Sequence, residues 1–198
     1  VVESPRNGGR GERTVGEKTV LTSVVNCNSP MVWDGTMLSA LTVYARNNQA
    51  VLVTPFNETE RAVAMIEQHA RELAAVIVEP LQRVLLPEPG FLQAMREVTA
   101  KHGIVLIFDE IFTGFRIAWG GAQEKYGVVP DLACYGKAVS GGFPLAAIAG
   151  RADVMAVLDA RTTPREKVVW ATNTLNGNPV CAAAGCAGAG SGALTSRE

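Results

Sequence analysis

The chain has 198 residues, of which 47% are hydrophobic and 19% are charged, a balance typical of a globular protein with a sizeable core. Its formal net charge of −1, from 18 basic and 19 acidic residues, argues against nucleic acid or an anionic membrane as a partner. No apolar run reaches the roughly 18 residues of a membrane span, and the first residues lack an apolar signal core, so we expect a cytoplasmic protein.

Residues 1–50 contain little regular patterning. The first part of this segment, "VVESPRNGGRGERTVGEKTV", is rich in Gly, Arg and Glu without periodicity, which favours an extended or disordered arm. We therefore expect an arm over about residues 1–20, within a poorly matching N-terminal segment over residues 1–50.

The next segments alternate between helical and strand patterns. Residues 57–73, "NETERAVAMIEQHAREL", have apolar positions at helical spacing, with Asn57 as a candidate N-cap. Residues 74–80 are a short apolar run ended by proline, which is typical of a buried strand. A helix over 90–103 and a second apolar run over 104–110 follow. The order strand, helix, strand predicts a parallel βαβ unit.

The alternation continues to the end of the chain. Residues 120–127 predict a short helix or loop, 131–136 another short strand, and 144–150 an apolar stretch that leads into a helix over 151–159. Residues 178–198 begin as an Ala-rich helix and become rich in Gly and Ser, so we expect an irregular tail over 186–198. The predicted fold is α/β, with a mostly parallel central sheet and flanking helices.

Three charged residues follow predicted strands. Glu79, Asp109 and Lys137 each lie at or just after the carboxyl end of one, and ligands of parallel sheets bind at that edge. A lysine in a cleft that excludes water is a nucleophile for carbonyl groups, and an opposed carboxylate suits a Schiff base with pyridoxal phosphate. The alternatives on spacing alone are a loop or N-cap acid for Asp109 and a solvated turn lysine for Lys137.

Four ordered motifs strengthen the first interpretation. "VIVEPLQ", "IFDEIFTGFR", "GGAQEKYGVVPDLACYGKAVSGGFPLAAIAGR" and "TLNGNPVCAAAG" together resemble the class III pyridoxal-phosphate aminotransferases. The likeness is greatest to the branch of glutamate-1-semialdehyde aminomutases and the aminotransferase modules of peptide and polyketide synthases. It implies that residues 51–185 are the central part of the large domain of a fold-type I pyridoxal-phosphate-dependent transferase.

The resemblance also implies roles for single residues. Lys137 would form the Schiff base with the cofactor and then move the proton, and Asp109 would pair with the pyridine nitrogen. Ile111 would pack on one face of the cofactor ring, with core packing as its alternative. Thr174 would reach the cofactor phosphate of a neighbouring subunit, which implies a homodimer. The substrates would be a small-molecule amino donor and a carbonyl acceptor.

Glu79 and Gln82 stand where the family often has polar groups near the cofactor, and a strand end followed by a proline turn also explains them. Other positions depart from the family pattern: residues 29–31 are Ser-Pro-Met where a Tyr-His-Gly motif is expected, and Phe112 stands where many members have Gln. The phosphate loop and the small substrate domain are not matched either, so we expect a truncated chain. A non-catalytic remnant of the fold is therefore the alternative function, and a nucleotide-binding α/β module is a third with no glycine fingerprint to support it.

Overall fold

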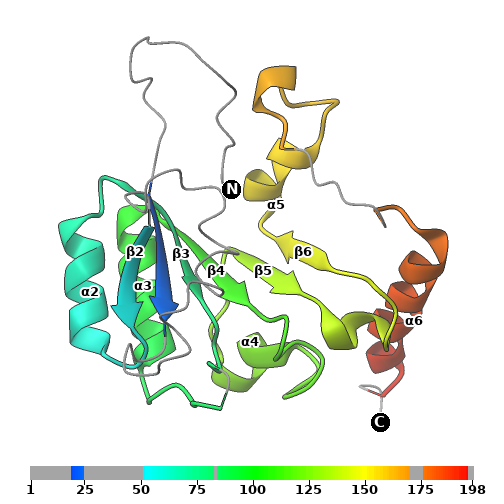
Figure 1. Cartoon of the computed structure of the whole chain (residues 1–198), viewed down its shortest axis with the longest axis horizontal. Coiled ribbons are helices and arrows are strands. Elements are labelled where there is room, and N and C mark those ends of the chain that lie inside the picture. The colour runs from blue at the N-terminus through cyan, green and yellow to red at the C-terminus, as the bar shows by residue number, and fades with distance from the viewer. Residues whose placement is uncertain (1–18, 25–50, 83, 170–175, 196–198) are drawn as a thin grey trace, which may run out of the picture.

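A six-stranded sheet forms the centre of the protein (Figure 1). The computed structural model describes residues 19–24, 51–82, 84–169 and 176–195. Strands β1 to β5 are mutually parallel, and β6 runs antiparallel to β5 at one edge. The strand order is β2-β1-β3-β4-β5-β6. The strands are β1 (Thr19–Val24), β2 (Val51–Pro55), β3 (Leu73–Val78), β4 (Val105–Asp109), β5 (Leu132–Tyr135) and β6 (Ala147–Gly150).

Helices connect the strands in the manner expected for an α/β fold, which confirms the predicted fold class. The predicted strands after residues 73, 104 and 131 are all present and pair as neighbours in the sheet. The helices are α2 (Thr59–Gln68), α3 (Phe91–His102), α4 (Gly121–Tyr126), α5 (Ala152–Met155) and α6 (Pro179–Thr195), with short 3₁₀ turns η2 (Lys137–Ser140), η3 (Ala156–Leu158) and η4 (Arg165–Lys167). Among the described residues, no helix is both long and apolar enough to cross a membrane.

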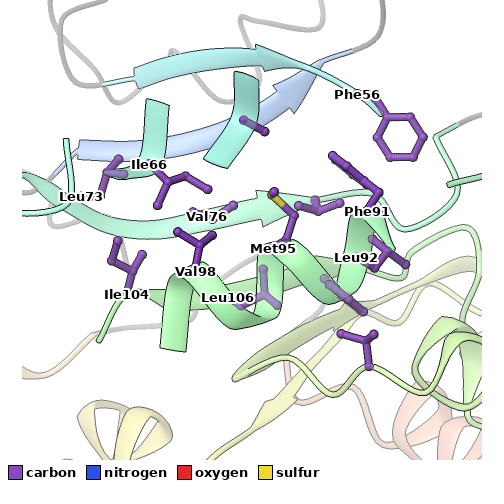
Figure 2. Close-up of a cluster of buried hydrophobic side chains, with 14 residues drawn as sticks. Phe56, Ile66, Leu73, Val76, Phe91, Leu92, Met95, Val98, Ile104 and Leu106 are labelled. Atoms are coloured by element: carbon purple, nitrogen blue, oxygen red, sulfur yellow. The ribbon is translucent and has the colours of Figure 1, made fainter. Parts of the chain in front are cut away.

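The main core lies between one face of the sheet and helices α2 and α3 (Figure 2). Phe91, Met95 and Val98 follow helical spacing on α3 and are all buried, so a single face of the helix meets the sheet. The ring of Phe91 packs edge-on against Phe56, with centroids 5.0 Å apart. Full burial of each such side chain stabilises the fold by about 1.5–3 kcal/mol.

The predicted helix over 57–73 is shorter at both ends in the structure. Asn57 is not its N-cap: the residue has φ 67°, and its side chain bonds the backbone of Leu86 and Glu88 instead. Helix α2 therefore starts at Thr59, after Glu58 in the N-cap position. At the other end, Leu73 is the first residue of β3, because its side chain belongs to the buried apolar run of that strand.

Two segments are more regular than the sequence suggests. Residues within the N-terminal 50 form β1, which pairs with β2 on one side and β3 on the other and so lies inside the sheet. Helix α6 continues to Thr195, past the point where we expected an irregular tail. Each internal glycine costs a helix only about 1 kcal/mol relative to alanine, and the alanines between them favour the helix.

A buried carboxylate fixes the start of β5. The Asp131 side chain accepts hydrogen bonds from the backbone N–H of Leu106 at 2.8 Å, from Arg96 of α3 at 3.0 Å and from Arg151 after β6 at 2.8 Å. Burial by itself raises the pKa of Asp131, but these donors outweigh it and leave the pKa below its ordinary value. One side chain thus joins β4, β5, α3 and the segment after β6.

Candidate functional site

Three strand ends meet at one edge of the sheet. Glu79 follows β3, Asp109 ends β4 and Lys137 comes two residues after β5, and these three strands are parallel neighbours. Asp109 lies opposite Cys134 in the register of β4 and β5, so Lys137 is three residues beyond that pair. The expected common edge for these charged residues is therefore present, in the place where parallel sheets bind ligands.

Asp109 is partly buried and has a free acceptor atom. Its Oδ1 accepts the backbone N–H of Ile111 at 3.0 Å, and no donor among the described residues reaches Oδ2. Across the strand pair, burial raises the pKa of the Cys134 thiol and the negative charge of Asp109 raises it further. The Asp109 carboxylate therefore lies close enough to Cys134 for its charge to act there, and it keeps one oxygen available for a ligand.

Lys137 is exposed at the start of η2, and its backbone has φ 49°. A left-handed conformation costs a residue with a Cβ about 1–2 kcal/mol, and such strain gathers at functional sites. The Nζ atom lies over the ring of Phe112, 5.6 Å from its centroid. In the part of the chain that the structure describes, the ammonium makes no hydrogen bond or ion pair, so its amine is accessible to a ligand.

Ile111 packs against the residue that precedes the lysine. A Cβ added to Gly136 would lie 3.3 Å from Ile111 Cγ2, which is a close contact. The absence of a side chain at Gly136 therefore lets the ends of β4 and β5 approach each other, and Ile111 remains partly exposed at the same edge.

Glu110 anchors the loop that carries Ile111 and Phe112, a role that the sequence analysis did not assign. Its side chain is fully buried and accepts hydrogen bonds from the Thr113 hydroxyl and the Ala122 N–H, both at 2.7 Å. It also accepts the Gln123 side-chain amide at 3.1 Å. The Ala122 and Gln123 donors come from the start of α4, so one carboxylate ties α4 to the end of β4. An acid directly after Asp109 was the only signal in the sequence.

The other three residues predicted to contact the cofactor are Glu79, Gln82 and Thr174. Gln82 is buried and forms a two-bond backbone bridge with Leu85 after β3. Glu79 is partly buried at the strand end. Thr174 lies outside the described residues, so its proposed contact with a phosphate stays a prediction.

Comparison with known proteins identifies the family. The family model described as aminotransferase class-III matches residues 27–188. The chain belongs to the class-III aminotransferase family. This class-III chain is 43% identical over 148 residues to a glutamate-1-semialdehyde 2,1-aminomutase of Roseiflexus castenholzii, an alignment that covers 73% of the chain and 33% of that relative. The chain thus spans about a third of the length of the curated relatives that it matches.

Solved structures of similar proteins have the same fold as this chain. An omega-transaminase from Sphaerobacter thermophilus superimposes with a TM-score of 0.70 and 35% identity, over 88% of this chain and 43% of the other. A second structure, described as a transaminase with PLP bound, gives a TM-score of 0.69 and 27% identity over 87% and 43% of the two chains. The mostly parallel sheet with flanking helices is therefore a segment of the fold of these transaminases.

The residues at the strand edge fit pyridoxal phosphate as far as the described segments reach. Lys137 has an accessible amine, Asp109 has a free carboxylate oxygen, and Ile111 presents a partly exposed aliphatic side chain next to Gly136. A carboxylate opposite a pyridine nitrogen and a lysine opposite an aldehyde are the groups that this cofactor requires of a protein.

Proposed function

We propose that this class-III chain carries the amino-group transfer site of a pyridoxal-phosphate-dependent aminotransferase or aminomutase. The observation that carries the proposal is the position of Asp109 and Lys137 at the carboxyl ends of two paired parallel strands. The family and the cofactor named for one structural neighbour support it. The substrates proposed are a small-molecule amino donor and a carbonyl acceptor.

Each residue has a separate role in this proposal. Lys137 would hold the cofactor through its Nζ atom, and the same atom, when free, would take up and return a proton. Asp109 would accept a hydrogen bond from the protonated ring nitrogen at its free Oδ2 and so favour the charged form of that nitrogen. Ile111 would orient the ring by packing on its face. When bound, pyridoxal phosphate supplies an electron sink that makes loss of a proton from the substrate carbon feasible.

Glu79, Gln82 and Thr174 are proposed as further polar contacts of the cofactor. For Glu79 the support is its place at the end of the strand beside β4. For Gln82 and Thr174 the support is their match to family motifs. The match of Thr174 also leads us to propose a homodimer, and sedimentation velocity over a range of protein concentrations tests for it.

The experiment treats the full chain with pyridoxal phosphate and borohydride and maps the labelled peptide by mass spectrometry. Lys137 Nζ attacks the aldehyde carbon, the oxygen leaves as water, and hydride addition leaves a stable secondary amine. We expect saturable labelling at Lys137 at low cofactor concentration. Labelling spread over surface lysines, or none, would contradict the proposal and favour a non-catalytic remnant of the fold.

Two variants control this measurement. Lys137→Arg keeps the positive charge but cannot form the adduct, so it should lose the label while its circular dichroism spectrum stays unchanged. Asp109→Asn leaves Lys137 able to react but should weaken cofactor binding at least tenfold, because a neutral amide does not stabilise the positive charge of the ring nitrogen. If the Lys137→Arg protein is labelled to the same extent, the adduct forms on another lysine and the assignment to Lys137 is wrong.

A further inference from the structure

An aromatic ring connects the two strand ends at the candidate site. Phe112 belongs to the loop after β4, yet the Nζ of Lys137, which follows β5, lies over its ring at 5.6 Å from the centroid. The guanidinium of Arg116 lies over the same ring at 5.2 Å. Both distances are within the roughly 6 Å range of cation–π attraction, and a contact of this kind at an exposed site contributes about 0.5–1 kcal/mol.

The loop that carries the ring is fixed from several sides. Glu110 holds the loop to α4 through the Thr113 hydroxyl and the Ala122 N–H, and Asp109 accepts the N–H of Ile111. Phe112 itself is 44% exposed, so the ring is held by its backbone and open toward the lysine. A ring in a fixed position can order a mobile side chain that touches it.

Lys137 is the side chain that needs such order. It is exposed, and it has no hydrogen bond or ion pair among the described residues that would restrict its four-carbon stem. Ordering a free lysine costs up to about 2 kcal/mol in rotamer entropy. Attraction to the Phe112 ring offsets part of this entropy cost before any ligand binds. It also holds the amine near the end of β4, where Asp109 and Ile111 lie.

We propose that Phe112 is a positioning residue for Lys137, and that its ring holds the lysine side chain at the β4 end in the cofactor-free protein. This inference rests on the proposed function for its catalytic meaning, but the contact itself is testable without any cofactor. It also gives a purpose to an aromatic residue that departs from the family pattern.

The first test is a spectroscopic signature of the cofactor-free chain. Lysines are converted to ¹³C-dimethyl-lysine, which keeps the positive charge, and the methyl signal of Lys137 is assigned by its loss in Lys137→Arg. We expect this signal upfield of exposed lysines, because protons over a ring face are shielded. Phe112→Tyr should keep the shift and Phe112→Leu should abolish it. An unchanged shift in Phe112→Leu would overturn the proposal.

A matched control separates the ring contact from a general effect of losing a phenyl group. Phe143 is 48% exposed, close to the value for Phe112, and no cation lies over its ring among the described residues. Phe143→Leu should therefore leave the Lys137 signal in place. Lys125, whose Nζ lies 5.9 Å from the Tyr126 centroid, provides an internal reference that none of these variants should change.

The second test measures the initial rate at which pyridoxal phosphate and borohydride label Lys137. We expect Phe112→Leu to slow labelling about two- to fivefold, because the lysine side chain is then no longer held at the end of β4, and Phe112→Tyr to restore the rate. An equal or faster rate in Phe112→Leu would contradict the positioning role. If the methylated chain shows the upfield Lys137 signal but the unmethylated chain is not labelled at Lys137, the proposed function fails while the Phe112 contact stands.

Discussion

At the residue scale, Lys137 has a backbone conformation that glycine adopts at lower cost. Its φ of 49° falls in the left-handed region, and the turn that follows it depends on this geometry. A residue kept there in spite of the strain indicates that its side chain is needed for something other than stability.

This strain gives the first prediction. Lys137→Gly should be more stable than Lys137→Ala by about 1 kcal/mol, because only alanine places a Cβ in the left-handed region. Both variants should lose the cofactor adduct. Urea denaturation followed by circular dichroism measures the difference, and equal midpoints would show that the turn relaxes around the substitution.

The second prediction concerns Cys134. Because burial and the Asp109 charge raise the pKa of its thiol, it should react with iodoacetamide at pH 8 more slowly than the exposed Cys186. Asp109→Asn removes one of the two causes, so Cys134 should then react faster while Cys186 keeps its rate. Peptide mapping of the alkylated chain gives both rates. An unchanged Cys134 rate in the variant would place the carboxylate farther from the thiol.

The sequence was informative for the residues that end strands and uninformative for those that support them. The positions of Asp109 and Lys137 at strand ends could be predicted because each lies at or just after the end of an apolar run. Glu110 could not, because its donors at Ala122 and Gln123 reach it only when the chain turns back at α4. The spacing of apolar and polar residues in the sequence does not show that the chain turns back there.

At the element scale, the position of β5 depends on Asp131. This carboxylate is 4% exposed and joins β5 to its neighbours through Leu106, Arg96 and Arg151. Since Lys137 comes two residues after β5, any loosening of this junction changes where the lysine lies.

The third prediction is a pH dependence at this junction. The folded protein lowers the pKa of Asp131 from its ordinary value of 3.8, so the stabilisation is complete above that value and is lost as the pH falls through the folded pKa. Asp131→Asn should lower the free energy of unfolding by about 2–3 kcal/mol at pH 7 and by less below pH 3. Chemical denaturation at several pH values measures both differences, and a constant difference across that range would contradict this account.

Elements also differ in how far the sequence predicts them. Strands β3, β4 and β5 could be predicted because each is a continuous apolar run buried on both faces. Strand β1, "TVLTSV", mixes apolar and hydroxyl side chains, and its partners β2 and β3 lie tens of residues away along the chain. Its place depends on those distant partners and is invisible to local periodicity.

At the scale of the whole molecule, the two faces of the sheet are covered unequally. The face toward α2 and α3 contains the large cluster of Figure 2, whereas the cluster on the other face, within the described residues, has only Ala75, Ile107 and Leu132 as buried members. At the β6 edge all four residues are exposed, and Ile148 is 53% exposed. An exposed apolar edge strand is a site for pairing with another chain.

The fourth prediction follows from this edge. Ile148→Lys should reduce self-association of the isolated chain, because a lysine on an edge strand opposes pairing, and the stability of the monomer should change little. Light scattering and sedimentation as a function of concentration provide the measurement. Val129→Lys, which adds the same single positive charge at an exposed apolar residue outside β6, is the control for a simple charge effect. Equal reduction by both variants would assign the effect to net charge.

The place of β1 inside the sheet has a consequence for how the chain is made. The ribosome delivers β1 before β2 and β3, so both partners emerge when the strand that must separate them already exists. Were the order of synthesis reversed, β2 and β3 could pair directly and β1 would have to open that pair to enter. We therefore expect the direction of translation to favour the insertion of β1 between β2 and β3, in the sheet that positions Asp109 and Lys137.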